Sequence, residues 1–267
     1  MRLGVIGLGL MGASFAAALR ARRPDIEVVG SDREPAVVAT ALERGLIAEP
    51  TLDRAEVLVV AVPAGAMRAV LNQLPRDVLV TDMASTKATV GSWARDAKLD
   101  FVGGHPMCGR EKAGIDAADP ELFVGAPWVI TRESALVEEL VAAVGAHPVV
   151  MDAERHDRLV AGISHAAFAV SAAYLLAVTG TGDWTEMAPL AGSGFRDMTR
   201  LASGSPEMYA GIATTNGENL AHWLRAIEGQ LARLRRHVEA GDPRLVELFE
   251  EARERRERWL AEHQPAG

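Results

Sequence analysis

The opening of the chain, LGVIGLGLMG at residues 3–12, decides the fold, because a short apolar run leads directly into three spaced glycines. Leu3–Ile6 has the character of a buried strand, and a helical pattern follows the glycines. Gly7 permits a tight turn, Gly9 leaves room for a pyrophosphate, and Gly12 lets the helix and the strand pack closely. This strand–turn–helix unit predicts a Rossmann-type domain that binds a dinucleotide at the start of a helix.

An acidic residue follows at the spacing that such a site requires. Asp32 comes just after the next strand, Ile26–Val29, about twenty residues beyond the last glycine. Its carboxylate is suited to bind ribose hydroxyls and would repel a 2′-phosphate, which favours NAD over NADP, although the adjacent Arg33 could serve a 2′-phosphate. Val62-Pro63 closes a third strand and is expected to line the crevice. The predicted cofactor-binding residues are Gly7, Leu8, Gly9, Leu10, Met11, Gly12, Asp32, Arg33, Val62, Pro63 and Ser85.

Strands and helices alternate up to about residue 150, and helices alone follow. Residues 1–150 are predicted to form an α/β dinucleotide-binding domain with a parallel sheet covered on both faces. Residues 151–267 are predicted to form an all-helical domain for substrate binding and dimerisation. Its expected elements are a helix over residues 152–178, a loop over 191–206, a long helix over 207–240 and a charged helix ending near Leu260.

The long helix carries apolar residues at alternating steps of four and three, the spacing of a heptad seam. They are Leu220, Leu224, Ile227, Leu231, Leu234 and Val238. Such a seam packs either against a helix of its own chain or against a second subunit. A homodimer is therefore one expectation, and packing within the domain is the other.

The composition excludes several classes of protein. With 267 residues, 49% of them apolar, the chain can build a core, and its single cysteine cannot form an internal disulfide. A net charge of −8 argues against nucleic-acid binding, which needs a basic surface. The uncharged run from Leu3 to Leu19 resembles a signal peptide, but its glycines disfavour a helix, and we expect no other stretch to span a bilayer. The expected location is the cytoplasm, without membrane contact.

His105 is the residue best placed for chemistry. It follows a predicted strand in the segment Gly103-Gly104-His105-Pro106, which predicts a sharp loop at the sheet edge where ligands bind. A neutral imidazole can take a hydroxyl proton, and with the ordinary pKa of about 6.5 activity should rise with pH through that value. A purely structural loop histidine is the alternative. Cys108 nearby adds too few ligands for a metal site, so none is predicted.

Two further groups are suited to bind an anionic substrate. Arg196 and Arg200, four residues apart after a glycine-rich bend, could clamp a carboxylate, or they could be solvated arginines at a helix start. His165 lies in the middle of a predicted helix, where a ligand-binding histidine and a buried core histidine are equally compatible with the pattern.

Taken together, these motifs resemble the prephenate and arogenate dehydrogenases of tyrosine biosynthesis over nearly the whole chain. The resemblance rests on the glycine turn and on Asp82–Lys87, Gly103–Met107, Ser164-His165 and Gly194–Arg200. It implies an NAD-dependent dehydrogenase that oxidises prephenate to 4-hydroxyphenylpyruvate with loss of the ring carboxylate.

The resemblance also implies roles for individual residues. His105 would accept the proton of the ring hydroxyl, Ser85 would hydrogen-bond that hydroxyl or orient His105, and Arg200 would bind the side-chain carboxylate. Since the substrate is a dianion and the protein is acidic, local cations must bind it. The implied substrate-binding residues are Arg200, Arg196, His165 and Lys112.

Three alternatives remain at this stage. Phe168 stands where prephenate-using relatives often carry a second histidine, so arogenate is a second possible substrate. The β-hydroxyacid dehydrogenases share the glycine turn but use a lysine on the interdomain helix, and this chain has no lysine after Lys112. A non-catalytic NAD-binding module would not need His105, Ser85 and Arg200 together.

Overall fold

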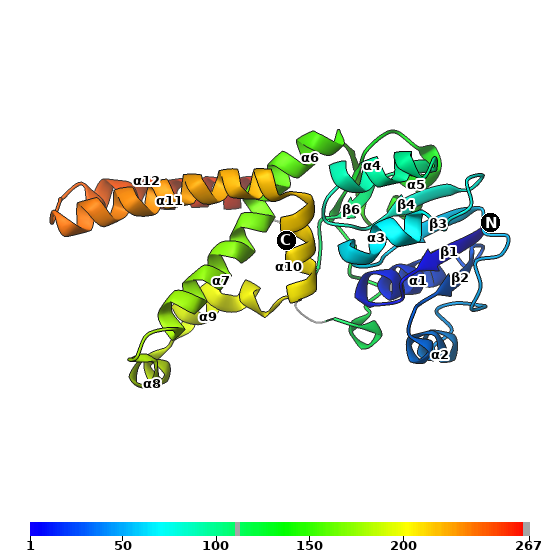
Figure 1. Ribbon diagram of the computed structural model, residues 1–267, viewed down its shortest axis with the longest axis horizontal. Coiled ribbons are helices and arrows are strands. Elements are labelled where there is room, and N and C mark those ends of the chain that lie inside the picture. The colour runs from blue at the N-terminus through cyan, green and yellow to red at the C-terminus, as the bar shows by residue number, and fades with distance from the viewer. Residues whose placement is uncertain (110–112, 264–267) are drawn as a thin grey trace. The chain divides into compact units, whose positions relative to one another are not determined.

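The computed structural model describes residues 1–109 and 113–263 and contains a five-stranded parallel sheet (Figure 1). In spatial order the strands are β2 (Glu27–Ser31), β1 (Arg2–Ile6), β3 (Val57–Val60), β4 (Leu79–Asp82) and β5 (Asp100–Val102). After β1 the chain forms β2 on one side of β1, and it then forms β3 on the opposite side of β1. Ligands bind in such sheets at the carboxyl ends of the strands where the order reverses, here β1 and β3. The predicted α/β fold class is confirmed.

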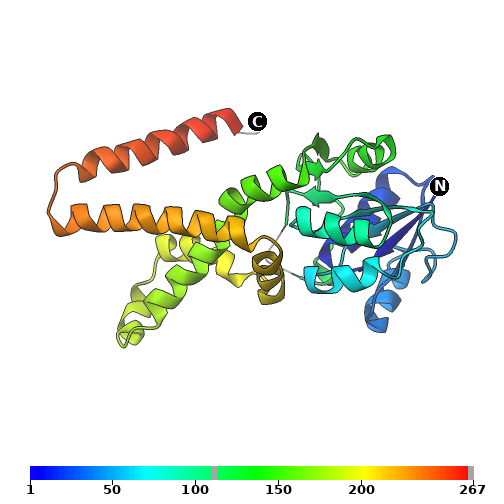
Figure 2. The same cartoon turned by 45° about the horizontal axis from the view of Figure 1, so that its top comes forward.

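Apolar side chains cover both faces of this sheet, because successive strand residues point to opposite sides. In β3, Val57 and Val59 belong to one apolar cluster, and Leu58 and Val60 belong to another. The first cluster includes side chains of α1 (Leu10–Arg22), α2 (Pro35–Glu43) and α5 (Ala135–Ala143). The second includes side chains of α3 (Ala64–Leu71) and α4 (Ala88–Asp96), which lie side by side (Figure 1 and Figure 2).

A second, three-stranded sheet departs from the expectation of a single sheet. It consists of β6 (Gly104–Pro106), antiparallel to β7 (Pro127–Ile130), which is in turn parallel to β8 (His147–Val150); the short helix η1 (Ile115–Ala117) lies between β6 and β7 in the chain. The predicted loop around His105 is therefore wrong. Glycine and proline neighbours suggested a turn, but residues 104–106 pair with a strand that begins more than twenty residues later, which local sequence cannot reveal.

The helix predicted from residue 152 is confirmed but contains an irregular turn. It runs through α6 (Ala153–Val160), a π-helical turn η2 (Ala161–His165) and α7 (Ala166–Thr179), and Asp152 caps it by accepting from the Arg155 main chain at 3.0 Å. Among the described residues, this is the one helix long and apolar enough to cross a membrane, contrary to the expectation that no stretch qualifies. Core helices of soluble proteins pass the same test, and this helix buries His156, Asp157 and His165.

The later helices correct two expectations. The loop predicted over residues 191–206 contains α9 (Ser193–Thr199) and η4 (Arg200–Ser203), after α8 (Trp184–Met187) and η3 (Ala188–Leu190). The long helix predicted over residues 207–240 is interrupted at Asn216, between α10 (Pro206–Thr215) and α11 (Gly217–Glu239); α12 (Leu245–His263) follows. The chain forms two compact units, residues 1–220 and 221–267. The domain division at residue 150, which falls between β8 and α6, remains a prediction.

Candidate active site

The glycine turn between β1 and α1 has the geometry that a dinucleotide requires. Gly7 has a φ of +91°, and its N–H donates to the Ser31 carbonyl at 2.9 Å. A Cβ on Gly12 would overlap the Gly7 carbonyl oxygen, whereas a Cβ on Gly9 would meet no atom of the described chain within 4 Å. Gly7 and Gly12 are thus constrained by the protein itself, and Gly9 faces open space where a pyrophosphate fits.

The start of α1 is free to bind an anion. Gly9 caps the helix without a side-chain hydrogen bond, and no acidic residue lies in the first turn, which includes Leu10 and Met11. Unpaired N–H groups and the helix dipole at this end favour a phosphate. These features fit NAD.

Asp32 has a role in the turn as well as the predicted one at the ribose. Its Oδ2 accepts from the Leu8 main chain at 2.7 Å, and its Oδ1 accepts from the Glu34 main chain at 3.0 Å. Each carboxylate oxygen keeps a lone pair for a ribose hydroxyl. Arg33 is exposed and forms an ion pair with Glu34 at 3.3 Å. Val62 and Pro63 lie between the end of β3 and the start of α3. Contact of these residues with the cofactor remains a prediction.

His105 heads a buried relay. Its Nδ1 lies 2.8 Å from His156 Nε2, and His156 Nδ1 lies 2.8 Å from Asp157 Oδ1. The two imidazoles meet edge to face, with an interplanar angle of 79°. His156 is wholly buried, whereas His105 keeps 9% of its surface exposed. His105 is therefore the most exposed member of the relay.

Donor and acceptor rules assign the protons along this relay. The Asp157 carboxylate can only accept, so His156 carries its proton on Nδ1. With a neutral ring, His156 Nε2 must then accept from His105 Nδ1–H. His105 is left with a lone pair on Nε2, which is the atom that can act as a base.

The pKa of His105 lies well below its ordinary value of 6.5. Burial is the largest cause, since it disfavours the charged ring, and Lys87, His156 and His165 add unfavourable charge interactions. The ordinary pKa expected for His105 is therefore wrong, and the rise of activity with pH is now expected below 6.5. His105 is already neutral, and hence able to accept a proton, well below that pH.

Main-chain donors hold Asp157 at the far end of the relay. Its Oδ1 accepts from the Lys87 N–H at 2.8 Å and its Oδ2 from the Ala88 N–H at 2.9 Å. These donors belong to the N-terminus of α4, where the helix dipole favours a negative charge. With His156 as a third donor, the buried carboxylate is hydrogen-bonded on both oxygens and fixed in orientation.

Asn216, at the break between α10 and α11, links the relay to His165. Its Nδ2 donates to the Asp157 main-chain oxygen at 2.8 Å and lies 3.2 Å from His165 Nδ1. Its Oδ1 accepts from Asn219 Nδ2 at 2.8 Å, which fixes the orientation of the amide. His165 Nδ1 must therefore accept, and the His165 proton resides on Nε2.

The His165 Nε2–H group has no well-formed hydrogen bond within the described part of the chain, although the Ser85 backbone lies close enough to interact with the ring. The atom is buried and has no hydrogen-bond partner among the described residues. Burial lowers the pKa of His165 to about 4, while the charge of Asp157 and the backbone of Ser85 act in the opposite direction. The ring is thus neutral at physiological pH. Unpaired buried donors are uncommon, so this one indicates a ligand acceptor.

The remaining predicted residues differ in how far the structure places them. Ser85 follows β4 and has its backbone near His165. Arg196 on α9 and Arg200 at the start of η4 are exposed, and their role as a clamp remains a prediction. Lys112 lies outside the described residues.

Sequence reasoning missed His156, Asp157 and Asn216. The adjacent His-Asp pair near the start of a predicted helix was one available signal. Asn216-Gly217 was another, since Asn-Gly within a helical pattern marks a break. The heptad spacing on the following helix masked it.

Comparisons with known proteins agree with this geometry. Residues 15–150 match the family model described as the prephenate dehydrogenase nucleotide-binding domain, and residues 152–251 match the one described as the prephenate dehydrogenase dimerization domain. The chain belongs to the prephenate dehydrogenase family. The resemblance stated from its motifs is therefore confirmed.

Individual members of the prephenate dehydrogenase family align along nearly the whole chain. The prephenate dehydrogenase of Lactococcus lactis is 31% identical over 95% of this chain and 76% of its own. The prephenate dehydrogenase of Aquifex aeolicus, solved with hydroxyphenyl propionate and NAD+, superimposes with a TM-score of 0.89 at 27% identity, covering 97% of this chain and 98% of its own. The Synechocystis arogenate dehydrogenase has a TM-score of 0.79 at 31% identity, covering 97% and 100%.

Proposed function

We propose that this chain catalyses the NAD-dependent oxidative decarboxylation of prephenate to 4-hydroxyphenylpyruvate, a step of tyrosine biosynthesis. The observation that carries the proposal is the relay from Asp157 through His156 to His105, which orients His105 at its more exposed end and supports Nε2 as the unprotonated atom. A dehydrogenase acting on a ring hydroxyl needs such a base, and the family supplies the substrate class.

In the proposed reaction, His105 Nε2 accepts the proton of the ring hydroxyl as that carbon becomes a carbonyl. NAD, when bound, supplies the hydride acceptor. The imidazolium that forms keeps its Nδ1–H bond to His156, whose own proton is held by the ionised Asp157. The C–C bond to the ring carboxylate breaks, carbon dioxide leaves, and its electron pair completes an aromatic ring. The carbonyl oxygen becomes a phenolate oxygen, which takes the proton back from His105. Aromatisation makes the step effectively irreversible, so the protein has mainly to orient the substrate and accept one proton.

The other residues bind and orient the dianionic substrate. The unpartnered Nε2–H of His165 donates to a substrate oxygen, and Ser85 hydrogen-bonds the reacting hydroxyl or orients His105. Arg200 binds the side-chain carboxylate, with Arg196 and Lys112 as further cations. The β-hydroxyacid alternative lacks its lysine, and a non-catalytic module would not need a buried relay.

Turnover tests the proposal directly. Purified protein with prephenate and NAD should produce NADH and carbon dioxide in equal amounts. His105→Asn should lower kcat by about 10²–10⁴-fold, as expected for loss of a general base, with little change in the KM for prephenate. His147→Asn, which alters an exposed histidine on β8, is the matched control and should retain activity. The absence of NADH with prephenate and with arogenate, and with either dinucleotide, would reject the proposal.

Arogenate is the second candidate substrate, because the Synechocystis relative is an arogenate dehydrogenase and because Phe168 occupies the position noted above. Phe168 stacks on Tyr209, with centroids 4.5 Å apart, and lies 6.0 Å from the ring of His165. An apolar ring there offers no hydrogen bond to a keto group. Comparison of kcat/KM for the two substrates decides between them, and a higher value for arogenate would reassign the activity.

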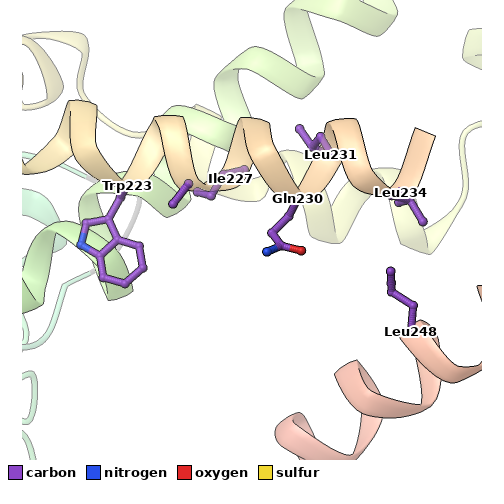
Figure 3. Close-up of a pocket in the computed structure, with 7 residues that line it drawn as sticks. Trp223, Ile227, Gln230, Leu231, Leu234 and Leu248 are labelled. Atoms are coloured by element: carbon purple, nitrogen blue, oxygen red, sulfur yellow. The ribbon is translucent and has the colours of Figure 1, made fainter. Parts of the chain in front are cut away.

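We also propose that the chain forms a homodimer through its second compact unit and that it acts in the cytoplasm. Ile227, Leu231 and Leu234 of α11 line an open apolar groove with Trp223 and with Leu248 of α12 (Figure 3). Leu231 is 58% exposed, and the chain matches a family domain described as a dimerization domain. We assign the groove to a helix of a second copy, since exposed apolar grooves mark interfaces.

Mass in solution tests the dimer. Leu231→Lys should shift the measured mass from dimer to monomer, while Val124→Lys, at an exposed apolar position of the nucleotide-binding half, should not. A monomeric wild-type protein, or a dimeric Leu231→Lys protein, would contradict the assignment.

A further inference from the structure

Lys87 and Asp82 form an ion pair that no solvent reaches. Both side chains are 0% exposed, and Lys87 Nζ lies 2.5 Å from Asp82 Oδ2. Bringing an ammonium and a carboxylate out of water costs several kcal/mol per ion, which their attraction does not always offset. A buried pair of this kind therefore calls for a reason other than stability.

The pair binds the main chain of Gly104, the residue that precedes His105. Lys87 Nζ donates to the Gly104 carbonyl at 2.5 Å, and Asp82 Oδ1 accepts from the Gly104 N–H at 2.8 Å. Both polar atoms of Gly104 are thus bound by one ion pair. A Cβ at Gly104 would lie 2.4 Å from the Asp82 main-chain oxygen and 2.9 Å from Trp128 Nε1, so only glycine fits at this position. The backbone position of His105 follows from this clamp.

The main chain of Lys87 holds the other end of the relay. Its N–H donates to Asp157 Oδ1 at 2.8 Å, the same oxygen that accepts from His156. A closed path of hydrogen bonds therefore runs from Gly104 through the Lys87 side chain and main chain to Asp157, then through His156 back to His105. Lys87 is the residue where the two halves of this path meet.

We infer that Lys87 is a positioning residue for His105: its side chain fixes the peptide that carries the base, and its main chain fixes the carboxylate that orients the relay. The inference rests on the proposed role of His105. The pKa of His105 supports it, because Lys87 is the largest charge contribution to its decrease, after burial. The other groups around His105 are His156 and Asp157 from α6, His165 from the π-turn and Asp82 from β4.

The test replaces the lysine by an apolar side chain of similar length. Lys87→Met should move the midpoint of the His105 titration upward, because a neighbouring positive charge is removed. The titration is followed by NMR, and the His105 signal is assigned as the one that His105→Asn removes. In the plot of kcat/KM against pH, the decrease on the acidic side should move upward by the same amount. The fold decrease in kcat should exceed the fold increase in the KM for NAD. Lys98→Met, which removes the same charge from an exposed position beyond α4, is the matched control and should leave both midpoints in place.

Three outcomes separate the possibilities. If Lys87→Met does not fold, the double variant Asp82→Asn/Lys87→Met, which leaves no unpaired buried charge, provides the measurement. An unmoved His105 titration in a folded variant, or failure of both variants to fold, would overturn the inference and make Lys87 a structural residue. If His105→Asn keeps its kcat, the proposed base itself is wrong, whatever Lys87 does.

Discussion

Asp157→Asn tests the relay because it replaces one carboxylate oxygen by an NH2 group and removes the negative charge, with almost no change of shape. Asp157 contributes a fixed negative charge to the imidazolium that forms when His105 accepts a proton, and it also dictates the tautomer of His156. An asparagine can keep its oxygen toward His156 and lose only the charge. It can also turn its NH2 group toward His156, which would place the proton on His105 Nε2 and disable the base.

The magnitude follows from the bonds involved. A hydrogen bond to a charged group contributes about 1.5–3 kcal/mol, which corresponds to a loss of about 10- to 150-fold in kcat. The reversed tautomer would add to this loss. Substitution also leaves the Ala88 N–H or the Lys87 N–H facing an amide NH2, so the free energy of unfolding should fall by about 1–3 kcal/mol, the cost of an unsatisfied buried donor.

Steady-state kinetics with saturating NAD, together with thermal unfolding of the same samples, provide the assay. Asp152→Asn is the matched control: it makes the same substitution at the cap of the same helix, where asparagine is as good a cap as aspartate. It should leave kcat unchanged. A kcat for Asp157→Asn within about twofold of the wild type, in a folded protein, would show that the relay does not assist His105 and would refute the reasoning.

Three further predictions concern the cofactor turn, the pH profile and the substrate clamp. Gly12→Ala should lower the melting temperature, because its Cβ would overlap the Gly7 carbonyl, whereas Gly9→Ala should weaken NAD binding in titration calorimetry without changing that temperature; equal melting shifts would contradict the assigned roles. The kcat/KM for prephenate should stay level as the pH is lowered through 6.5, because the base must be neutral and its pKa lies well below that value; a decrease centred at 6.5 would count against it. Arg200→Ala should raise the KM for prephenate by about 10-fold or more with a smaller change in kcat, as for loss of a charged hydrogen bond, and an unchanged KM would assign Arg200 to structure.

The sequence was sufficient for the first βαβ unit and for the family. The spacing of Gly7, Gly9 and Gly12 is imposed by backbone clashes a few residues apart, so local pattern and local structure coincide. The start of a helix at residue 152 was likewise correctly expected, because the Asp152 cap is decided within one helical turn. His105 as the base remains a prediction, and its placement in a loop and its ordinary pKa were wrong.

What the chain determined by itself is thus the glycine turn, the alternation of strands and helices, and the choice of His105 as the residue that we propose to accept the proton. Tertiary structure alone decided how that residue works. β6 forms only when β7 reaches it, Asn216 meets His165 only after α10 has folded back, and the Lys87–Asp82 pair surrounds Gly104 only within the closed core. Desolvation and hydrogen bonding between distant segments set the proton positions and the pKa of His105, and neither quantity is encoded in the neighbours that the residue has along the chain.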